Sequence, residues 1–160
     1  MRADARLPLF LALPRGRLLA ALFLLCAATA ARSDGPTSNE IRFDILGLRS
    51  DKGTVNCTLF TSADGYPNDE SKAARRVKTI IEHGRAACVF DEPRAGTYAI
   101  SFIHDENENG KLDTNFLGMP SEGVGASNDA HSALGGPKWD DAKFEHKDGL
   151  QALEVHAHYL

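Results

Sequence analysis

Apolar and polar residues alternate in several short segments of the chain, a pattern typical of β-strands with one buried face. Ile41, Phe43 and Ile45 share one face of the first such segment, and charged residues separate them. Residues 54–60 repeat the alternation, and residues 150–160 do so again at the end of the chain. These segments predict strands rather than helices.

The segment TYAISFIH, residues 97–104, is apolar on both faces. Tyr98, Ile100 and Phe102 lie on one face, and smaller apolar or hydroxyl residues lie on the other. A strand that is apolar on both sides is typical of the middle of a sheet that is covered on both faces. We therefore expect this strand to be central.

Residues 76–90, RVKTIIEHGRAACVF, permit two interpretations. Ala73, Val77 and Ile80 approximate helical spacing, which favours a helix over residues 70–82. Val, Thr and two Ile crowd the end of that segment, and β-branched residues favour strands. We predict two strands around a turn at His83-Gly84, preceded by a loop with one helical turn.

A long stretch, Asp105 to Asp141, is rich in Gly, Asn, Asp and Ser and shows no periodicity. Strands resume at residues 142–146 and 150–160. About seven short strands with turns between them predict an all-β fold, an antiparallel β-sandwich with one long loop. The folded domain is expected to cover residues 40–160, after a polar linker at residues 31–39.

The first thirty residues have the features of a secretory signal peptide. Arg15 and Arg17 precede an apolar run, Leu18 to Cys26, and Ala28-Thr29-Ala30 offers a cleavage site. The apolar run is too short for a membrane span, which needs about 20 residues. Leu25 before Cys26 disfavours lipid attachment, so we expect cleavage after Ala30 and a periplasmic or secreted product.

The charge changes when residues 1–30 are removed, because they hold four Arg and one Asp. The 18 Lys and Arg then become 14, the 22 Asp and Glu become 21, and the net charge becomes -7. An acidic surface repels phosphate backbones and anionic lipid, so nucleic acid and membrane partners are not expected. It does attract divalent cations.

Two cysteines, Cys57 and Cys88, remain after the leader is removed. An even pair in an oxidising compartment predicts a disulfide. The alternative is a pair of free buried thiols.

The start of the long loop has a pattern that suits calcium. Asp105, Asn107, Asn109 and Asp113 place side-chain oxygens at loop positions 1, 3, 5 and 9. Calcium prefers six to eight oxygen ligands, and alternate residues of a tight loop aim inward. At position 6, Gly110 permits the bend that would bring the Lys111 carbonyl to the ion, while Glu106 and Glu108 would point outward.

Two features weaken the calcium prediction. Phe116 stands at position 12, where helical calcium hands carry a glutamate, and the flanks are not helices. We expect a weak site, of order 10⁻⁴–10⁻³ M, with Glu122 or Asp129 as further ligands. The alternative is that Asx turns and the Asn109-Gly110 turn simply fold the connection.

Other residue groups carry weaker signals. His104, His156 and His158 would form a zinc or copper site if their strands were neighbours. Trp139 is the only tryptophan, and it suits a core position better than a sugar-stacking platform. Ser121 and Ser127 lack the sequence around a catalytic nucleophile.

The string PRAGTYAISFIHDENENGKLDTNFLGMPSEGVGASN, residues 93–128, is distinctive. Through it, and through the closing LEVHAHYL, the chain resembles an uncharacterised bacterial exported family, the domain-of-unknown-function family 2141. The resemblance spans nearly the whole chain after the leader. It implies export and a β fold, and it supplies no reaction.

The stretch DENENGKLD, residues 105–113, is also similar to the calcium loops of prealbumin-like B repeats in bacterial surface adhesins. This similarity implies a prealbumin-like (transthyretin-like) sandwich, with metal at Asp105, Asn107, Asn109, Asp113 and the Lys111 carbonyl. Phe116 departs from that pattern at the final ligand.

These observations predict a non-catalytic, monomeric β-sandwich module of unknown ligand, with a structural calcium loop. One alternative is a small enzyme or carbohydrate-binding accessory protein that acts through residues 105–141. Another is an adhesion or assembly module that pairs through an exposed strand edge.

Overall fold

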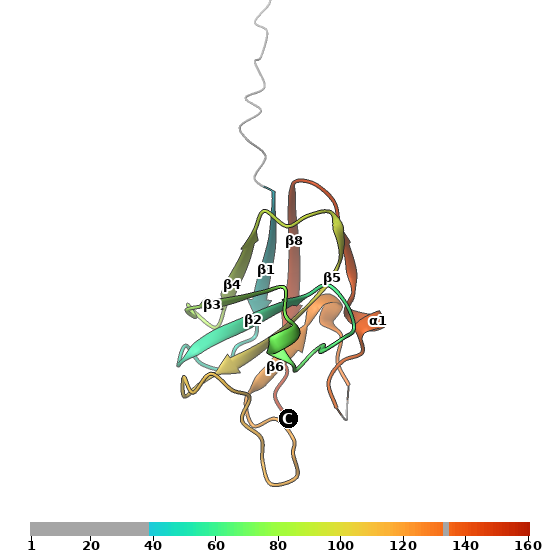
Figure 1. The fold of residues 1–160 in the computed structure, drawn as a ribbon. Helices are drawn as coiled ribbons and strands as arrows, with labels where there is room; N and C mark the ends of the chain where they lie inside the picture. The colour runs from blue at the N-terminus through green and yellow to red at the C-terminus, as the bar shows by residue number, and fades with distance from the viewer. Residues whose placement is uncertain (1–38, 133–134) are drawn as a thin grey trace, which may run out of the picture. The chain divides into compact units, whose positions relative to one another are not determined.

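Residues 39–132 and 135–160 are described by the computed structural model, and they form a sandwich of two β-sheets (Figure 1). The predicted signal peptide and nearly all of the predicted linker lie outside the described residues. The strands are β1 Glu40–Leu46, β2 Thr54–Phe60, β3 Arg75–Thr79, β4 Ala86–Asp91, β5 Gly96–Asp105, β6 Gly123–Ala126, β7 Phe144–His146 and β8 Leu150–His156. The helices are one-turn segments, η1 Glu70–Lys72, η2 Ser127–Asp129 and α1 Trp139–Ala142.

The smaller sheet has the order β4-β1-β8, and the larger has the order β3-β2-β5-β6 with β7 also paired to β5. The prediction of an all-β sandwich is therefore confirmed. The prediction that it is antiparallel is wrong for one pair, because β8 runs parallel to β1. Alternation of apolar residues identifies a strand and its faces, but it does not give the direction of the neighbouring strand.

Apolar side chains fill the space between the two sheets. Ile41, Phe43 and Ile45 of β1 are fully buried, as the alternation predicted. The Phe43 ring meets the edge of Phe102 from β5, with ring centroids 6.0 Å apart. Full burial of one such side chain stabilises a fold by about 1.5–3 kcal/mol, so this layer is the main source of stability.

A disulfide joins Cys57 of β2 to Cys88 of β4. Since β2 and β4 belong to different sheets, the bond links the two layers through the core. The predicted pairing of these cysteines is confirmed.

The larger sheet is also covered on its other face. Ala99 of β5 packs there with Ala126 and Ala142, and Tyr66 and Trp139 close the cluster. The Tyr66 and Trp139 rings lie edge to face at 5.7 Å. β5 is thus covered on both sides and paired on both edges, which confirms the prediction that it is central.

Two segments resolve questions that the sequence left open. Residues 75–91 contain strands β3 and β4, so the two-strand prediction is confirmed. The alternative helix over residues 70–82 is wrong, because only η1, at the start of that range, is helical. The stretch 105–141 is less irregular than predicted, because it contains β6 and the start of α1.

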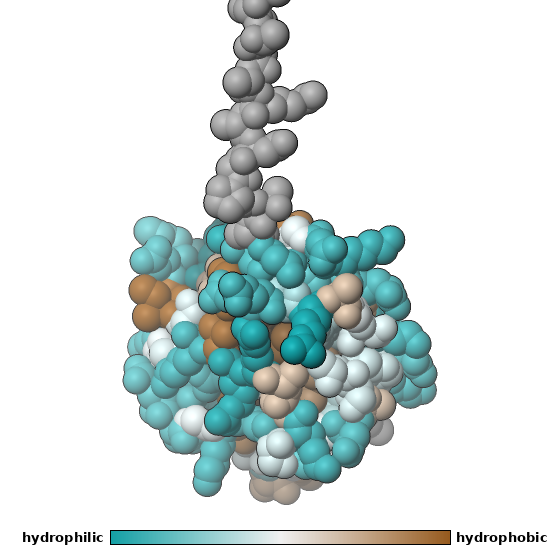
Figure 2. All heavy atoms as spheres, turned by 45° about the horizontal axis from the view of Figure 1, so that its top comes forward, coloured by the Kyte–Doolittle hydropathy of each residue, from teal (hydrophilic) through white to brown (hydrophobic). Residues whose placement is uncertain are grey.

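The face of the molecule drawn in Figure 2 is mostly hydrophilic, with separate apolar residues. The connection between β5 and β6 projects beyond the sheets on the same side as the C-terminus (Figure 1). This connection carries the predicted calcium loop.

Candidate functional site

The predicted loop begins at Asp105, the last residue of β5, whose side chain is fully buried. The Asn109 N–H donates to its Oδ1 at 3.0 Å, and the Gly110 N–H donates to its Oδ2 at 2.8 Å. Asn56 of β2 donates to the same Oδ2 at 3.1 Å. This carboxylate therefore curls the loop back on itself, and Gly110 permits the bend with a φ of 75°.

The next polar side chains of the loop meet at Asp113. The Nδ2 of Asn107 donates to one Asp113 carboxylate oxygen at 2.6 Å, and the Nδ2 of Asn109 donates to the other at 3.0 Å. The Oδ1 atoms of the two asparagines accept the N–H groups of Asn109 and Lys111. Three of the predicted ligand side chains thus converge, with Asp105 beneath them, while Lys111 is exposed.

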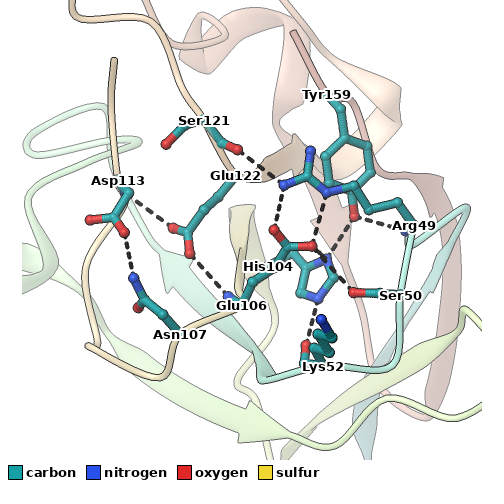
Figure 3. Close-up of polar contacts among 10 residues, drawn as sticks. All are labelled: Arg49, Ser50, Lys52, His104, Glu106, Asn107, Asp113, Ser121, Glu122 and Tyr159. Atoms are coloured by element: carbon teal, nitrogen blue, oxygen red, sulfur yellow. Dashed lines mark hydrogen bonds and ion pairs between the residues drawn. The ribbon is translucent and has the colours of Figure 1, made fainter. Parts of the chain in front are cut away.

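Glu122 closes the loop from its far end. Its carboxylate is buried, and it accepts the Glu106 N–H and the Asp113 N–H, each at 3.0 Å (Figure 3). The sequence placed Glu122 among possible metal ligands, and the structure places it beside Asp113 as a backbone clamp. Asp129, the other suggested ligand, is bound instead to the backbone N–H and the ring of His156.

The Glu106 carboxylate is bound by residues outside the loop, which the prediction did not name. It forms an ion pair with Arg49, whose Nε donates to Oε1 at 2.9 Å, and it accepts a hydrogen bond from Ser50. The hydrogen bond from Arg49 favours the ionised carboxylate and lowers the pKa of Glu106 to about 2. Glu108, by contrast, is exposed as predicted.

Arg49 links the loop to the end of the chain. Its guanidinium lies 4.6 Å from the centroid of the Tyr159 ring and also donates to the Ser121 carbonyl. The Tyr159 hydroxyl accepts the Arg49 N–H and contacts Nδ1 of His104 at 2.7 Å (Figure 3). Burial raises the pKa of Tyr159, so the phenol stays protonated.

The three histidines of the alternative metal site are not brought together. His104 is fully buried, and its other nitrogen, Nε2, contacts the Lys52 carbonyl at 2.8 Å. His156 is bound to Asp129, and the His158 ring stacks beside His131. Each of these histidines has a different setting, which argues against a shared zinc or copper ion.

An open depression of about 540 Å³ lies beside the loop. Arg49, Lys52, Glu106, Asp113 and Glu122 are among the residues that line it. Its chemistry is that of carboxylate, amide and cationic groups close together. Within the described ranges, no three His, Cys, Asp or Glu side chains are grouped as a metal site, so any ion here depends on the asparagine amides as well.

The sequence analysis identified the oxygen-bearing side chains inside the loop. It missed the residues outside the loop, Arg49 and Tyr159, that hold the loop in place. Arg49 and Glu106 are 57 positions apart, and Tyr159 is 110 positions from Arg49. No local pattern connects such residues. The one sequence signal was that an arginine and an acidic loop coexist in a small domain.

The described part of the chain is thus a small β-sandwich domain with a polar, oxygen-rich loop at one end. Residues 43–154 match the model of a family described as an uncharacterized protein conserved in bacteria, DUF2141, and the chain belongs to this family. The resemblance to domain-of-unknown-function family 2141 that was inferred from the sequence is confirmed. Neither the curated proteins nor the solved structures yielded a match. In residues 39–132 and 135–160 there is no helix with the length and apolar character to cross a membrane.

Proposed function

We propose that this chain is an exported, non-catalytic binding module whose Asp105–Asp113 loop takes a calcium ion. The observation that carries the proposal is the convergence of Asn107 and Asn109 on the Asp113 carboxylate, at 2.6 and 3.0 Å. Oxygen-bearing side chains at alternate positions, closed by a glycine, are the ligands that calcium prefers in tight loops. Rotation of the two amides would turn their oxygens toward the same centre.

In this proposal the ion is structural. It neutralises Asp113, which begins a hairpin over residues 113–121, and so fixes the orientation of that hairpin. The hairpin is already folded by Asn115, whose Oδ1 accepts the N–H groups of Leu117 and Met119. Phe116 and Leu117 at its tip are 94% and 70% exposed. In this proposal, these two adjacent apolar side chains form the surface that contacts a partner, as contiguous exposed apolar surface does in other proteins.

The geometry favours a binding module over a small enzyme or a carbohydrate-binding accessory protein. That alternative needs a cleft that joins Trp139, His104 and the loop carboxylates. His104 is fully buried with both ring nitrogens in contact, and Trp139 packs against Tyr66. Both oxygens of the Glu122 carboxylate are occupied by backbone N–H groups.

Export is supported by the Cys57–Cys88 disulfide, because such bonds persist in oxidising compartments. The basic and apolar leader in residues 1–30 points the same way. We expect a periplasmic or secreted monomer, and a mass by light scattering that grows with concentration would favour the assembly alternative.

Calcium titration tests the proposal. At about 10 mM calcium, a site with a dissociation constant of about 10⁻⁴–10⁻³ M stabilises the fold by about 1.4–2.7 kcal/mol. We expect the midpoint of thermal unfolding to rise accordingly, and a chelator to reverse the rise. Asp113→Asn, which keeps the shape of the side chain but removes its charge, should abolish most of the response.

Glu108→Gln is the matched control, because it removes one charge from an exposed position of the same loop. It should respond to calcium as the unmodified protein does. An unfolding midpoint that does not move with calcium, or an Asp113→Asn variant that responds fully, would reject the proposed site.

A further inference from the structure

A second cavity, of about 430 Å³, lies beside the same hairpin and shares no lining residue with the depression next to the loop. Its walls come from β5 and β6, from the hairpin, and from residues 67–68, 130–132, 135–137 and 158–160, and most of their side chains are apolar. They include Ile103, Leu112, Met119, Pro120, Val124 and Leu160. Cavities of about 300–1,000 Å³ with apolar walls and few polar groups are typical small-molecule sites.

Two histidines, His131 and His158, add polar groups to this cavity. Their rings lie 5.2 Å apart and are tilted by 35°. The backbone of His158 is paired with Val124 of β6 through two hydrogen bonds of 2.9 Å, so this histidine has a fixed position. The Nδ1 of His131 contacts the Asp129 carbonyl at 3.0 Å, which holds the second ring.

The Nε2 atom of His158 is buried and has no hydrogen-bond partner. A buried polar atom without a partner costs about 1–3 kcal/mol, so such an atom in a native fold calls for an explanation. In the imidazolium form and in the Nε2–H tautomer this atom is a donor. A turn of the His158 ring toward the cavity, which this residue lines, would bring the atom to an oxygen of a bound molecule.

We propose that this cavity binds a small soluble amphiphile, a monocarboxylate with an apolar tail. The tail lies against the apolar walls, among them Ile103, Met119 and Val124, and the carboxylate accepts a hydrogen bond from His158. The site is separate from the calcium loop, since none of the residues proposed to hold the ion lines this cavity. It adds a ligand class to the proposed binding module and does not require the metal.

Decanoate is a suitable probe, used below its micelle concentration with the purified full chain and calorimetric detection. We expect saturable binding of one decanoate per chain. His158→Phe keeps a ring and the paired backbone but removes the nitrogen, and it should weaken decanoate about tenfold, as expected for loss of a hydrogen bond to a charged group. Val124→Trp should fill the cavity and abolish binding.

Ile80→Trp is the matched control, because it adds the same side chain at an exposed position outside this cavity. It should bind decanoate as the unmodified chain does. Met119→Trp replaces Val124→Trp if the latter does not fold. Absence of saturable binding, or undiminished binding by a folded cavity-filling variant, would overturn the proposal, and full binding by His158→Phe would overturn the assignment of the head group.

Asp113→Asn separates this test from the calcium test. It should lose the calcium response and keep decanoate binding. A variant that loses both would show that the cavity depends on the loop and would overturn the claim of two separate sites.

Discussion

The space between the two sheets and the loop end of the domain are held together by different forces. Between the sheets, Ile41, Phe43 and Ile45 are removed from water completely, and the Cys57–Cys88 bond crosses the layer. At the loop end, the Glu122 carboxylate accepts hydrogen bonds from backbone N–H groups, and the Glu106 carboxylate pairs with Arg49. The first region depends on burial, and the second depends on charge.

This difference predicts how each region responds to its surroundings. Hydrophobic burial follows the apolar area removed from water and does not depend on the ionisation of side chains. Charge-assisted hydrogen bonds depend on the ionisation of each carboxylate, and a bound cation would add to them. The loop end is therefore the part of the molecule that changes of pH and bound cations would modify, and the sandwich is the part that persists.

Removal of the disulfide has the largest expected effect, and it acts on the sandwich. The bond closes a loop with a sequence separation of 31 residues. In the chain-entropy model, closing such a loop contributes about 3–4 kcal/mol to the free energy of unfolding. The double variant Cys57→Ala/Cys88→Ala should lose about that amount in urea denaturation. Its calcium response should be unchanged, and a loss below about 1 kcal/mol would contradict the entropic account.

Much of the sandwich was predictable from the sequence, because burial leaves a local pattern. Alternation identified the buried faces of β1 and β2, and β5 was recognised as central from its two apolar faces. β6 was missed because Gly123-Val124-Gly125-Ala126 carries almost no strand signal. A Cβ at Gly123 would lie 2.6 Å from the Tyr159 ring, and one at Gly125 would lie 2.4 Å from the Phe102 ring. Glycine is required at these two positions because side chains distant in the sequence pack against the backbone there, and the local sequence does not reveal such contacts.

Disruption of the Glu122 clamp has an intermediate expected effect, and it acts on the loop end. Glu122→Gln replaces one of two acceptor oxygens by an NH₂ group that faces a backbone N–H. Loss of a hydrogen bond to a charged group costs about 1.5–3 kcal/mol. Hydrogen exchange at the Glu106 and Asp113 amides should accelerate.

The same experiment compares the two regions directly. Hydrogen exchange at the backbone amides of β1 and β5 should change only as much as the global free energy of unfolding changes. Equal acceleration at the loop and in those strands would mean that the two regions unfold as one unit, and the distinction drawn above would fail.

The loop itself was half predictable. The spacing of Asp105, Asn107, Asn109 and Asp113 identified a turn-forming, oxygen-rich segment, and Gly110 has the positive φ that the bend requires. The ion pair of Glu106 with Arg49 was not predictable, because a lone arginine after β1 has no pattern that assigns its partner. Pairs of this kind are decided by the path of the whole chain.

Removal of the Glu106 charge has the smallest expected effect on stability at neutral pH. Acid should weaken the loop end, because it protonates this carboxylate. Its pKa is lowered from 4.5 to about 2 by Arg49, so the folded state binds the proton less readily than the unfolded state. The stabilisation is complete above about pH 4.5 and is lost as the pH falls toward 2.

Glu106→Gln should cost about 1 kcal/mol at pH 7, as for a partly exposed ion pair, and should make the unfolding free energy fall less steeply between pH 5 and 2. Glu108→Gln, in the same loop without an ion pair to Arg49, should keep the steep fall. If the two variants gave the same acid profile, the ion pair would contribute nothing to the pH dependence of the fold.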